Sequence, residues 1–328
     1  MKSKQPPFEI TNTIISDVAE IAELVGKLTS TQQLSSSPTL RRNNRIRTIH
    51  ASLAIEQNTL SLEQVTAVLN GKQIIAPPKD IAEVKNAYEI YEHMEQLDPY
   101  SVDALLTAHG VMMRGILPEA GEFRAKSVGV VNQEGHILHF GTLPPYVPGL
   151  VEELLNWARE SDLPMVIRSC VFHYEFELIH PFSDGNGRMG RLWHTLLLSK
   201  WNPMFAWLPV ESIIHDHQQE YYEAINASNA AGASTLFIEF MLLAIKASLT
   251  EAISVSDEMS DAPKDKAIIR WAAIEKYLKT HPYIMNADVR TLCNVSSATA
   301  NRVLAGLVAD GKLEKYREVG HWAYHIGI

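Results

Sequence analysis

The sequence predicts a mainly α-helical protein with one β-hairpin in its body and a small module after it. Apolar residues recur every three to four positions through most of the chain, and only one segment of the body alternates as a hairpin should. A length of 328 residues exceeds one average domain and favours two. With 46% hydrophobic and 20% charged residues, the composition is globular and excludes a disordered chain.

The helices of the body are expected in order along the chain. An amino-terminal helical segment, residues 1–38, contains apolar residues at helical spacing between Val18 and Leu28 and ends in a serine-rich loop. A second helix is expected over residues 39–58. Further helices are expected at residues 81–91, 102–113, 147–160, 165–179, 188–201, 212–228 and 235–253.

The hairpin is expected over Val128–Phe140. Alternating apolar residues flank Asn132-Gln133-Glu134-Gly135, which has the composition of a turn, and Pro144-Pro145 closes the segment. Pattern alone leaves open whether this is an ordinary edge hairpin or a docking surface.

A linker and a second module follow the body, which we place at residues 39–253. Residues 254–264 are polar and acidic and contain Pro263, so they are expected to be an interdomain linker. Residues 265–328 show three helical patterns and then a strand pair, an order that resembles a winged helix-turn-helix. Residues 264–328 have a net charge of +4, against −13 for the rest, which leaves DNA and a protein equally open as the partner of this module.

Composition excludes several classes of protein. A net charge of −9 argues against a chain that is entirely a nucleic-acid binder, and two cysteines are too few for a disulfide framework. No stretch approaches the ~18 apolar residues of a membrane span, and the first ten residues lack a secretory pattern. We therefore expect a soluble cytoplasmic protein without a membrane partner, and the sequence leaves open whether it forms a homodimer.

One segment, residues 180–191, combines the groups needed to bind and react with a polyphosphate. A short glycine-rich loop precedes a helix, whose first backbone N–H groups lack helical acceptors and attract anions. Arg188 and Arg191 add positive charge, and Asp184 offers oxygen ligands for magnesium. His180 can accept a proton from a hydroxyl near neutral pH. The alternative is a glycine-rich helix cap with a core histidine and two surface arginines, but the coincidence of all these groups favours phosphoryl or nucleotidyl transfer.

This segment resembles the signature of the Fic family, His-x-Phe-x-Asp-Gly-Asn-Gly-Arg-x-x-Arg, and matches all eight fixed positions. Three neighbouring segments agree with the family, and the likeness covers about residues 40–250. These segments are Gly121-Glu122-Phe123-Arg124, Pro144-Pro145 and Phe176-Glu177.

The resemblance implies adenylyl transfer, in which ATP gives AMP to a Ser, Thr or Tyr hydroxyl of a target protein. His180 would deprotonate that hydroxyl, Asp184 would hold Mg²⁺, and the hairpin would be a flap that pairs with the target backbone. The related Doc kinases have lysine in place of Gly187, so phosphorylation is disfavoured. The residues implied for ATP are Gly185, Asn186 and Gly187 around the phosphates, and Arg188 and Arg191 at the β- and γ-phosphates.

A stripe on a later helix is a candidate adenine site. Tyr222, Ile225 and Asn229 lie three and four residues apart, and similar residues enclose adenine in relatives. The alternative is an ordinary core stripe. The chain departs from the family at Ala233, where an acidic residue is frequent.

Residues 52–56 resemble the inhibitory helix motif of the family, Ser/Thr-x-x-x-Glu-Gly/Asn, except that Gln57 stands where Gly or Asn is usual. The spacing places Ser52 and Glu56 on one helix face, where the hydroxyl can fix the carboxylate. The resemblance implies an ion pair from Glu56 to Arg191 that keeps ATP in an unproductive pose. The alternative is a surface glutamate.

The sequence thus predicts a Fic-type adenylyltransferase that is autoinhibited by Glu56. Two other functions stay open: a nucleotide-sensing DNA-binding regulator, against which the intact His180 argues, and a de-AMPylating enzyme in which Glu56 orients a water.

Overall fold

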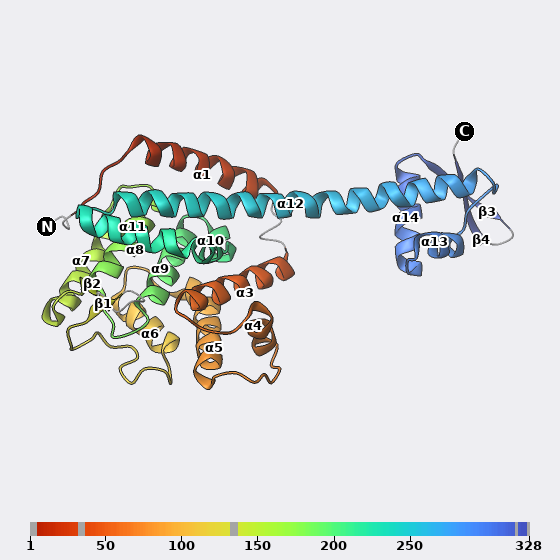
Figure 1. Cartoon of the computed structure of the whole chain (residues 1–328). Helices are drawn as coiled ribbons and strands as arrows, with labels where there is room; N and C mark the ends of the chain where they lie inside the picture. The colour runs from red at the N-terminus through yellow and green to blue at the C-terminus, as the bar shows by residue number, and fades with distance from the viewer. Residues whose placement is uncertain (1–4, 32–36, 132–136, 319–320, 327–328) are drawn as a thin grey trace. The chain divides into compact units, whose positions relative to one another are not determined.

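A computed structural model describes residues 5–31, 37–131, 137–318 and 321–326 of the chain (Figure 1). The chain forms two compact units, Met1–Ser254 and Val255–Ile328. None of the helices in the described residues combines the length and the apolarity that a membrane span requires.

The first unit consists of helices around one apolar core, together with one two-stranded sheet in its described residues. Its helices are α1 (Asn12–Thr31), α3 (Pro38–Ile55), α4 (Leu62–Leu69), α5 (Pro78–His93), α6 (Val102–Met112), α7 (Val147–Glu160), α8 (Met165–Ile179), α9 (Asn186–Trp201), α10 (Val210–Asp216), α11 (Gln218–Ala231) and the first part of α12 (Thr235–Leu278), with short 3₁₀ helices η1 (Met94–Gln96), η2 (Pro144–Tyr146) and η3 (Pro203–Trp207).

Helices α8 and α9 form the centre of this unit. Both are buried along most of their length and are joined by the short loop 180–185. A Cβ atom on Gly190 would lie 2.9 Å from side-chain atoms of His173 and Glu177, so glycine is needed where the two helices approach. This close packing fixes the position of the loop that the sequence identifies as the reactive segment.

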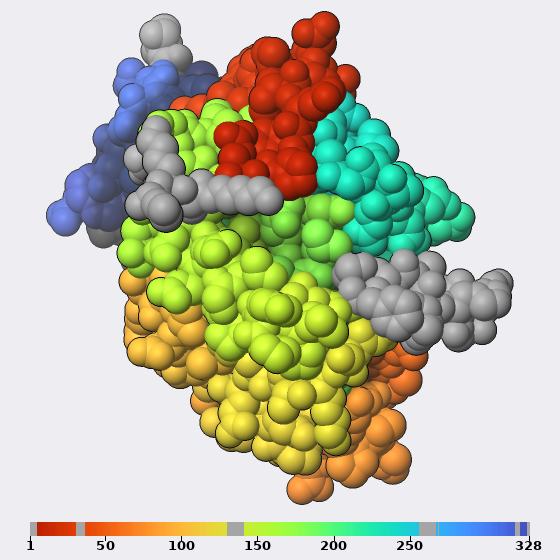
Figure 2. Space-filling view, turned by 90° about the vertical axis from the view of Figure 1, so that its left-hand side faces the viewer, coloured from red at the N-terminus to blue at the C-terminus, as the bar shows by residue number. Residues whose placement is uncertain are grey.

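Segments from distant parts of the sequence share the surface of the first unit. Helix α1 runs alongside the first part of α12, where Lys246 pairs with Asp17 at 2.6 Å and the hydroxyl of Thr11 donates to Glu239 at 2.6 Å (Figure 1). On the face seen in Figure 2, atoms near the amino terminus (red) lie above yellow-green atoms from the middle of the chain, and the chain that follows α6 (yellow) lies below these.

The predicted hairpin is confirmed. Strands β1 (Gly129–Val131) and β2 (Ile137–Phe140) pair antiparallel with Gly129 opposite Phe140, and the register shifts between Val130 and Val131. The predicted turn residues 132–135 lie outside the described residues.

Three predicted element boundaries were wrong. The helix expected over 39–58 ends at Ile55, because Gln57 adopts a left-handed backbone with φ of 66°. The helix expected over 212–228 is divided between α10 and α11 at His217, where φ of −117° and ψ of 39° are not helical. The helix expected to end at residue 253 continues through residues 254–264 as part of α12, since apart from one proline this stretch contains residues that helices tolerate, and no glycine. The chain divides into its two units after Ser254, where the linker was expected.

The second unit contains the end of α12, then α13 (Asn286–Cys293), α14 (Ser297–Ala309), β3 (Leu313–Glu318) and β4 (His321–Ile326). A small apolar core that includes Ile274, Ile284 and Leu304 holds these elements together. The Ser296 side chain caps α14, as predicted, by accepting from the N–H of Thr299 at 3.3 Å. The order of elements is the expected one, while the winged-helix assignment and its DNA or protein partner stay predictions.

Candidate active site

The loop between α8 and α9 begins at His180, whose backbone is left-handed. Its φ of 53° and ψ of 63° end α8, a conformation that costs a non-glycine residue about 1–2 kcal/mol. The buried Arg124 stabilises this turn, because its Nε donates to the carbonyl oxygen of His180 at 2.6 Å. The imidazole Nδ1 lies 3.4 Å from the carbonyl oxygen of Glu177, which favours a proton on Nδ1 and a lone pair on Nε2. The backbone and the ring of His180 are thus both held at the start of the loop.

The base of the hairpin lies beside this histidine. Gly141 follows β2, and its N–H donates to the carbonyl oxygen of Val128 at 3.0 Å. A Cβ atom on Gly141 would lie 2.9 Å from Nη2 of Arg124 and 3.4 Å from the Cβ of His180. Arg124 therefore contacts both the base of the hairpin and the loop that begins at His180.

His109 of α6 supports the middle of the loop. Its Nδ1 accepts from the backbone N–H of Gly121 at 2.9 Å, so its proton is on Nε2, which donates to the carbonyl oxygen of Asp184 at 3.1 Å. The ring stacks on Phe182 with centroids 3.7 Å apart. Burial lowers the pKa of His109 to about 4, so this imidazole is neutral at pH 7.

The side chain of Asn186 closes the loop on itself. Its Oδ1 accepts from the N–H of Phe182 at 2.9 Å, and its Nδ2 donates to the carbonyl oxygen of Phe182 at 2.8 Å. Since the side chain is used inside the loop, Asn186 can offer a phosphate only its backbone N–H.

The first turn of α9 presents a set of backbone donors. The helical hydrogen bonds begin with the N–H of Met189 and the carbonyl oxygen of Gly185, at 3.0 Å. Within the described residues, the backbone N–H groups of Asn186, Gly187 and Arg188 make no hydrogen bond to an acceptor of the protein. Together with the positive end of the helix dipole, these groups make an anion-binding position.

Asp184 and Arg188 lie at the edge of this position and contact each other. Asp184 Oδ1 accepts from the N–H of Gly185 at 2.6 Å and from Arg188 Nη2 at 2.9 Å, while its side chain remains 45% exposed. Arg188 is buried, and its Nη1 donates to Glu83 of α5 at 2.8 Å.

Arg191 is held by the end of α3. Its Nη2 donates to Glu56 Oε1 at 2.8 Å and to the carbonyl oxygen of Ser52 at 2.9 Å, and its Nε donates to the Ser52 hydroxyl at 3.1 Å. The Ser52 hydroxyl accepts from Arg191, the arginine that pairs with Glu56, and whether it also fixes the Glu56 carboxylate stays a prediction. Burial lowers the pKa of Arg191, but the charge and the hydrogen bond of Glu56, together with Tyr221 and Tyr222, raise that pKa above its usual value.

The Glu56 carboxylate also lies directly over the first turn of α9. A Cβ atom on Gly187 would be 2.2 Å from Glu56 Oε1, so only glycine leaves room for the carboxylate. The nearby Glu177 does not compete for Arg191, because burial and the Glu56 charge raise its pKa to about 8 and keep it protonated at pH 7. Glu56 is therefore the anion that occupies this part of the site.

The candidate adenine stripe is on α11 and is not plain core. Tyr222 is 40% exposed, and Ile225 and Asn229 are partly buried. Asn229 Oδ1 accepts from the hydroxyl of Tyr174 at 2.8 Å, which fixes one end of the stripe. Gln218, at the start of α11, donates to the carbonyl oxygen of Ile55 at 3.1 Å and links this helix to the inhibitory segment.

Three residues with roles in this site were not predicted. Glu83 and His109 gave no recognisable signal, since each is one polar residue on an amphipathic helix. Arg124 lies in the segment Gly121–Arg124 that supported the family resemblance, but its contact with His180 required the fold. In the part of the chain that the structure describes, no three His, Cys, Asp or Glu side chains form a metal cluster.

Comparison with known proteins places this geometry in a family. The model of the Fic/DOC family matches residues 96–198. A crystal structure of a Fic family protein from Desulfovibrio desulfuricans G20 is 39% identical, with a TM-score of 0.76, over 99% of this chain and 98% of that one. The chain belongs to the Fic/DOC family. The matched residues of this Fic protein include His180, Asp184 and both arginines of α9, whereas Glu56 and Glu83 precede them.

More distant relatives of this Fic protein have curated names. "Protein adenylyltransferase fic-1" of Caenorhabditis elegans is 29% identical over 227 residues, which are 65% of this chain and 42% of that protein. "Protein adenylyltransferase Fic" of Culex quinquefasciatus is 30% identical over 231 residues, 66% of this chain and 43% of that protein. The chain thus spans less than half the length of these two relatives. The C. elegans Fic-1 structure, at 22% identity and a TM-score of 0.61 over 75% of this chain and 74% of that one, supports the fold.

Proposed function

We propose that this Fic protein is a protein adenylyltransferase that moves AMP from ATP to a Ser, Thr or Tyr hydroxyl of a target protein and is autoinhibited by Glu56. One observation carries the proposal: a carboxylate of the chain lies over the first turn of α9 and pairs with Arg191 at 2.8 Å. A carboxylate there takes the place suited to a phosphate oxygen. The curated names of the relatives agree with this activity.

In this reaction, His180 at the start of the loop is the general base. His180 Nε2 accepts the proton of the target hydroxyl, whose oxygen forms a bond to the α-phosphorus of ATP. The bond between the α-phosphorus and the bridging oxygen to the β-phosphate breaks, and pyrophosphate leaves. Backbone N–H groups of Gly187 and Arg188 and the arginine side chains bind the phosphates, whose charge they offset during the reaction.

Magnesium fits the edge of this site. Mg²⁺ usually binds to one or two protein carboxylates and to substrate phosphates, and Asp184 offers a carboxylate that is 45% exposed beside the anion position. Bound there with ATP, the ion would reduce the negative charge of the phosphates. Asp184 can bind it once its Oδ1 no longer accepts from Arg188.

The inhibition by Glu56 acts on the binding of the ATP phosphates rather than on the binding of the nucleoside. While Glu56 holds Arg191, that arginine cannot bind the γ-phosphate, and the Glu56 charge repels it. The candidate adenine stripe stays accessible, since Tyr222 is 40% exposed. ATP can therefore bind with its α-phosphorus out of line for attack.

The hairpin is the proposed docking site for the target. In the described residues β1 and β2 form a two-stranded sheet, so each strand has one edge that can accept a further strand. Its base contacts Arg124, which holds the His180 turn. A target strand added here would bring its hydroxyl toward His180.

The test compares three forms of the full chain: wild type, Glu56→Gly, and Glu56→Gly combined with His180→Ala. Each is incubated with ATP, Mg²⁺ and a cell lysate, and proteins are searched by mass spectrometry for the mass gain of one AMP. We expect AMP on the chain and on a target with Glu56→Gly, and none when His180 is also replaced. As a control, Glu63→Gly places the same change at an exposed glutamate of α4 and should behave as wild type. No AMP with Glu56→Gly, or equal AMP with and without His180, would contradict the proposal.

A further inference from the structure

Arg188 is bound to two carboxylates that differ in their surroundings. Its Nη1 donates to Glu83 Oε1 and its Nη2 to Asp184 Oδ1, at 2.8 and 2.9 Å. The Glu83 side chain is only 5% exposed, whereas that of Asp184 is 45% exposed. An incoming phosphate can replace the exposed partner, but breaking the buried pair would leave an uncompensated buried charge. Nη1 is therefore a fixed contact and Nη2 an exchangeable one.

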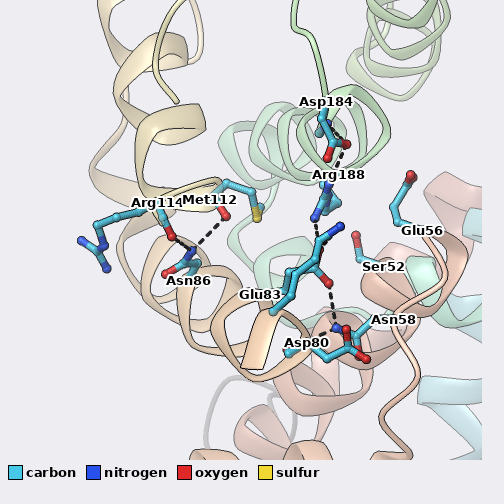
Figure 3. Close-up of polar contacts among 12 residues, drawn as sticks. Ser52, Glu56, Asn58, Asp80, Glu83, Asn86, Met112, Arg114, Asp184 and Arg188 are labelled. Atoms are coloured by element: carbon cyan, nitrogen blue, oxygen red, sulfur yellow. Dashed lines mark hydrogen bonds and ion pairs between the residues drawn. The ribbon is translucent and has the colours of Figure 1, made fainter. Parts of the chain in front are cut away.

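The second oxygen of Glu83 binds the segment that follows Glu56. Asn58 Nδ2 donates to Glu83 Oε2 at 2.8 Å and to the carbonyl oxygen of Asp80 at 3.2 Å. Thr59 strengthens this junction, since its N–H donates to the Asp80 carboxylate at 3.0 Å. Figure 3 shows Asp184, Arg188, Glu83 and Asn58 in one line of contacts, with Glu56 to the side.

The two arginines of α9 are thus bound to the same short stretch of chain by different routes. Arg191 contacts Glu56 directly, and Arg188 contacts it through Glu83 and Asn58, two residues farther along. A movement of the backbone that takes Glu56 away from Arg191 would also move Asn58, because only Gln57 separates the two residues. Glu83 is the only link of this route within the described residues that contacts both Asn58 and Arg188.

We infer that Glu83 is a positioning residue, which holds Arg188 through Nη1 so that Nη2 passes from Asp184 to a non-bridging oxygen of the β- or γ-phosphate, and that Asn58 couples this arrangement to the inhibitory segment. The inference rests on the proposed function for the identity of the nucleotide. Under this inference, Glu83 affects the binding of the β- and γ-phosphates of ATP, which AMP lacks. A residue that only stabilised the fold would affect ATP and AMP alike.

The first experiment measures ATP and AMP binding by calorimetry, with Mg²⁺, in the full chain with Glu56→Gly. Adding Glu83→Gln keeps an acceptor near Arg188 but removes the charge, so we expect the Kd for ATP to rise about 10-fold and that for AMP less than 2-fold. The matched control is Asn86→Ala on the same helix, whose side chain donates to the carbonyl oxygens of Met112 and Arg114 at 3.2 and 2.8 Å (Figure 3). It should leave the ratio of the two affinities unchanged. An equal loss for ATP and AMP with Glu83→Gln would overturn the inference.

The second experiment uses Asn58→Ala, which leaves the ion pair of Arg188 intact and so keeps the test valid if Glu83→Gln unfolds. With Glu56 present, we expect AMP transfer to rise about 3- to 10-fold, because one hydrogen bond of the junction to a charged group is lost. With Glu56→Gly, the same change should have no effect on transfer. Equal effects in both backgrounds, or none in either, would remove the coupling. If the Glu56→Gly chain transfers no AMP, the proposed function fails, while the ATP-to-AMP binding ratio still tests Glu83.

Discussion

The end of α3 and the middle of α5 each supply one carboxylate to an arginine of α9, and both contacts measure 2.8 Å. Glu56 caps α3, is 28% exposed, and is followed by a residue in a left-handed conformation. Glu83 lies inside α5, is 5% exposed, and has a second partner in Asn58. The two contacts therefore have the same length but differ in how readily they can be broken. A carboxylate at a partly exposed helix end can leave its arginine, whereas one on the buried face in the middle of a helix cannot do so without disrupting part of the core.

This difference suits the two parts of a regulated site. An inhibitory group has to be removable, and Glu56 is a partly exposed side chain at the end of α3. An arginine that binds a ligand in every reaction cycle has to keep its position, and the buried Glu83 carboxylate holds Arg188 in place. The contrast predicts that stability and activity respond in opposite ways to the loss of the two carboxylates.

Replacing each glutamate by alanine tests that contrast with the largest expected effect. Glu83→Ala should lower the free energy of unfolding by about 3–5 kcal/mol, because Arg188 loses the partner of a buried ion pair. Glu56→Ala should lower it less, because the Glu56 carboxylate is 28% exposed and Arg191 keeps its hydrogen bonds to the hydroxyl and the carbonyl oxygen of Ser52. Urea titration of the full chain measures both values, and similar losses for the two variants would remove the distinction.

Low pH should destabilise the part of the site that contains Arg188. The reason is His109, which donates to the carbonyl oxygen of Asp184. Burial lowers the pKa of His109 from 6.5 to about 4, so the unfolded chain takes up a proton more readily than the folded one in that range. Stability present above pH 6.5 is therefore lost as the pH falls toward 4. His109 alone should cost about 2 kcal/mol between pH 7 and pH 5.

The variant His109→Gln isolates this effect, because its amide can still donate to the carbonyl oxygen of Asp184 but does not titrate. Its loss of unfolding free energy between pH 7 and pH 5 should be smaller than that of wild type by about 2 kcal/mol. The same pH dependence in both proteins would show that His109 is not the group responsible.

The smallest expected effect concerns the residue after Glu56. Gln57 has φ of 66°, a conformation that glycine adopts without strain, so Gln57→Gly should raise the free energy of unfolding by about 0.5–1 kcal/mol. The control Gln219→Gly, in the exposed part of helix α11, should lower it by about 1 kcal/mol. A fall in stability at both positions would contradict the backbone strain that we assign to Gln57, the residue after Glu56.

Much of the fold followed from local pattern, while part of the site depended on tertiary contacts. Helices α7 and α8 were predicted with their observed bounds, because apolar spacing and flanking prolines mark both ends. The break at His217 and the continuous helix through Pro263 were not, since no residue near 217 is a helix breaker and the one proline of the second stretch does not end the helix.

The reactive segment was identified because its residues are adjacent in sequence. Glu56 was identified because residues 52–56 resemble the inhibitory helix motif of the family, and its pair with Arg191 agrees with what that resemblance implied. The role of the Ser52 hydroxyl, the closed side chain of Asn186 and the support by Glu83 all depend on side-chain direction, which spacing does not encode.

Labelling by ATP with the isotope on one phosphate tests the central claim most directly. The full chain with Glu56→Gly is incubated in parallel with ATP labelled at the α-phosphate and ATP labelled at the γ-phosphate. We expect protein to acquire the α-label and not the γ-label, and we expect His180→Ala to remove the signal. Incorporation of the γ-label, or of neither label once Glu56 is gone, would contradict AMP transfer held off by this carboxylate.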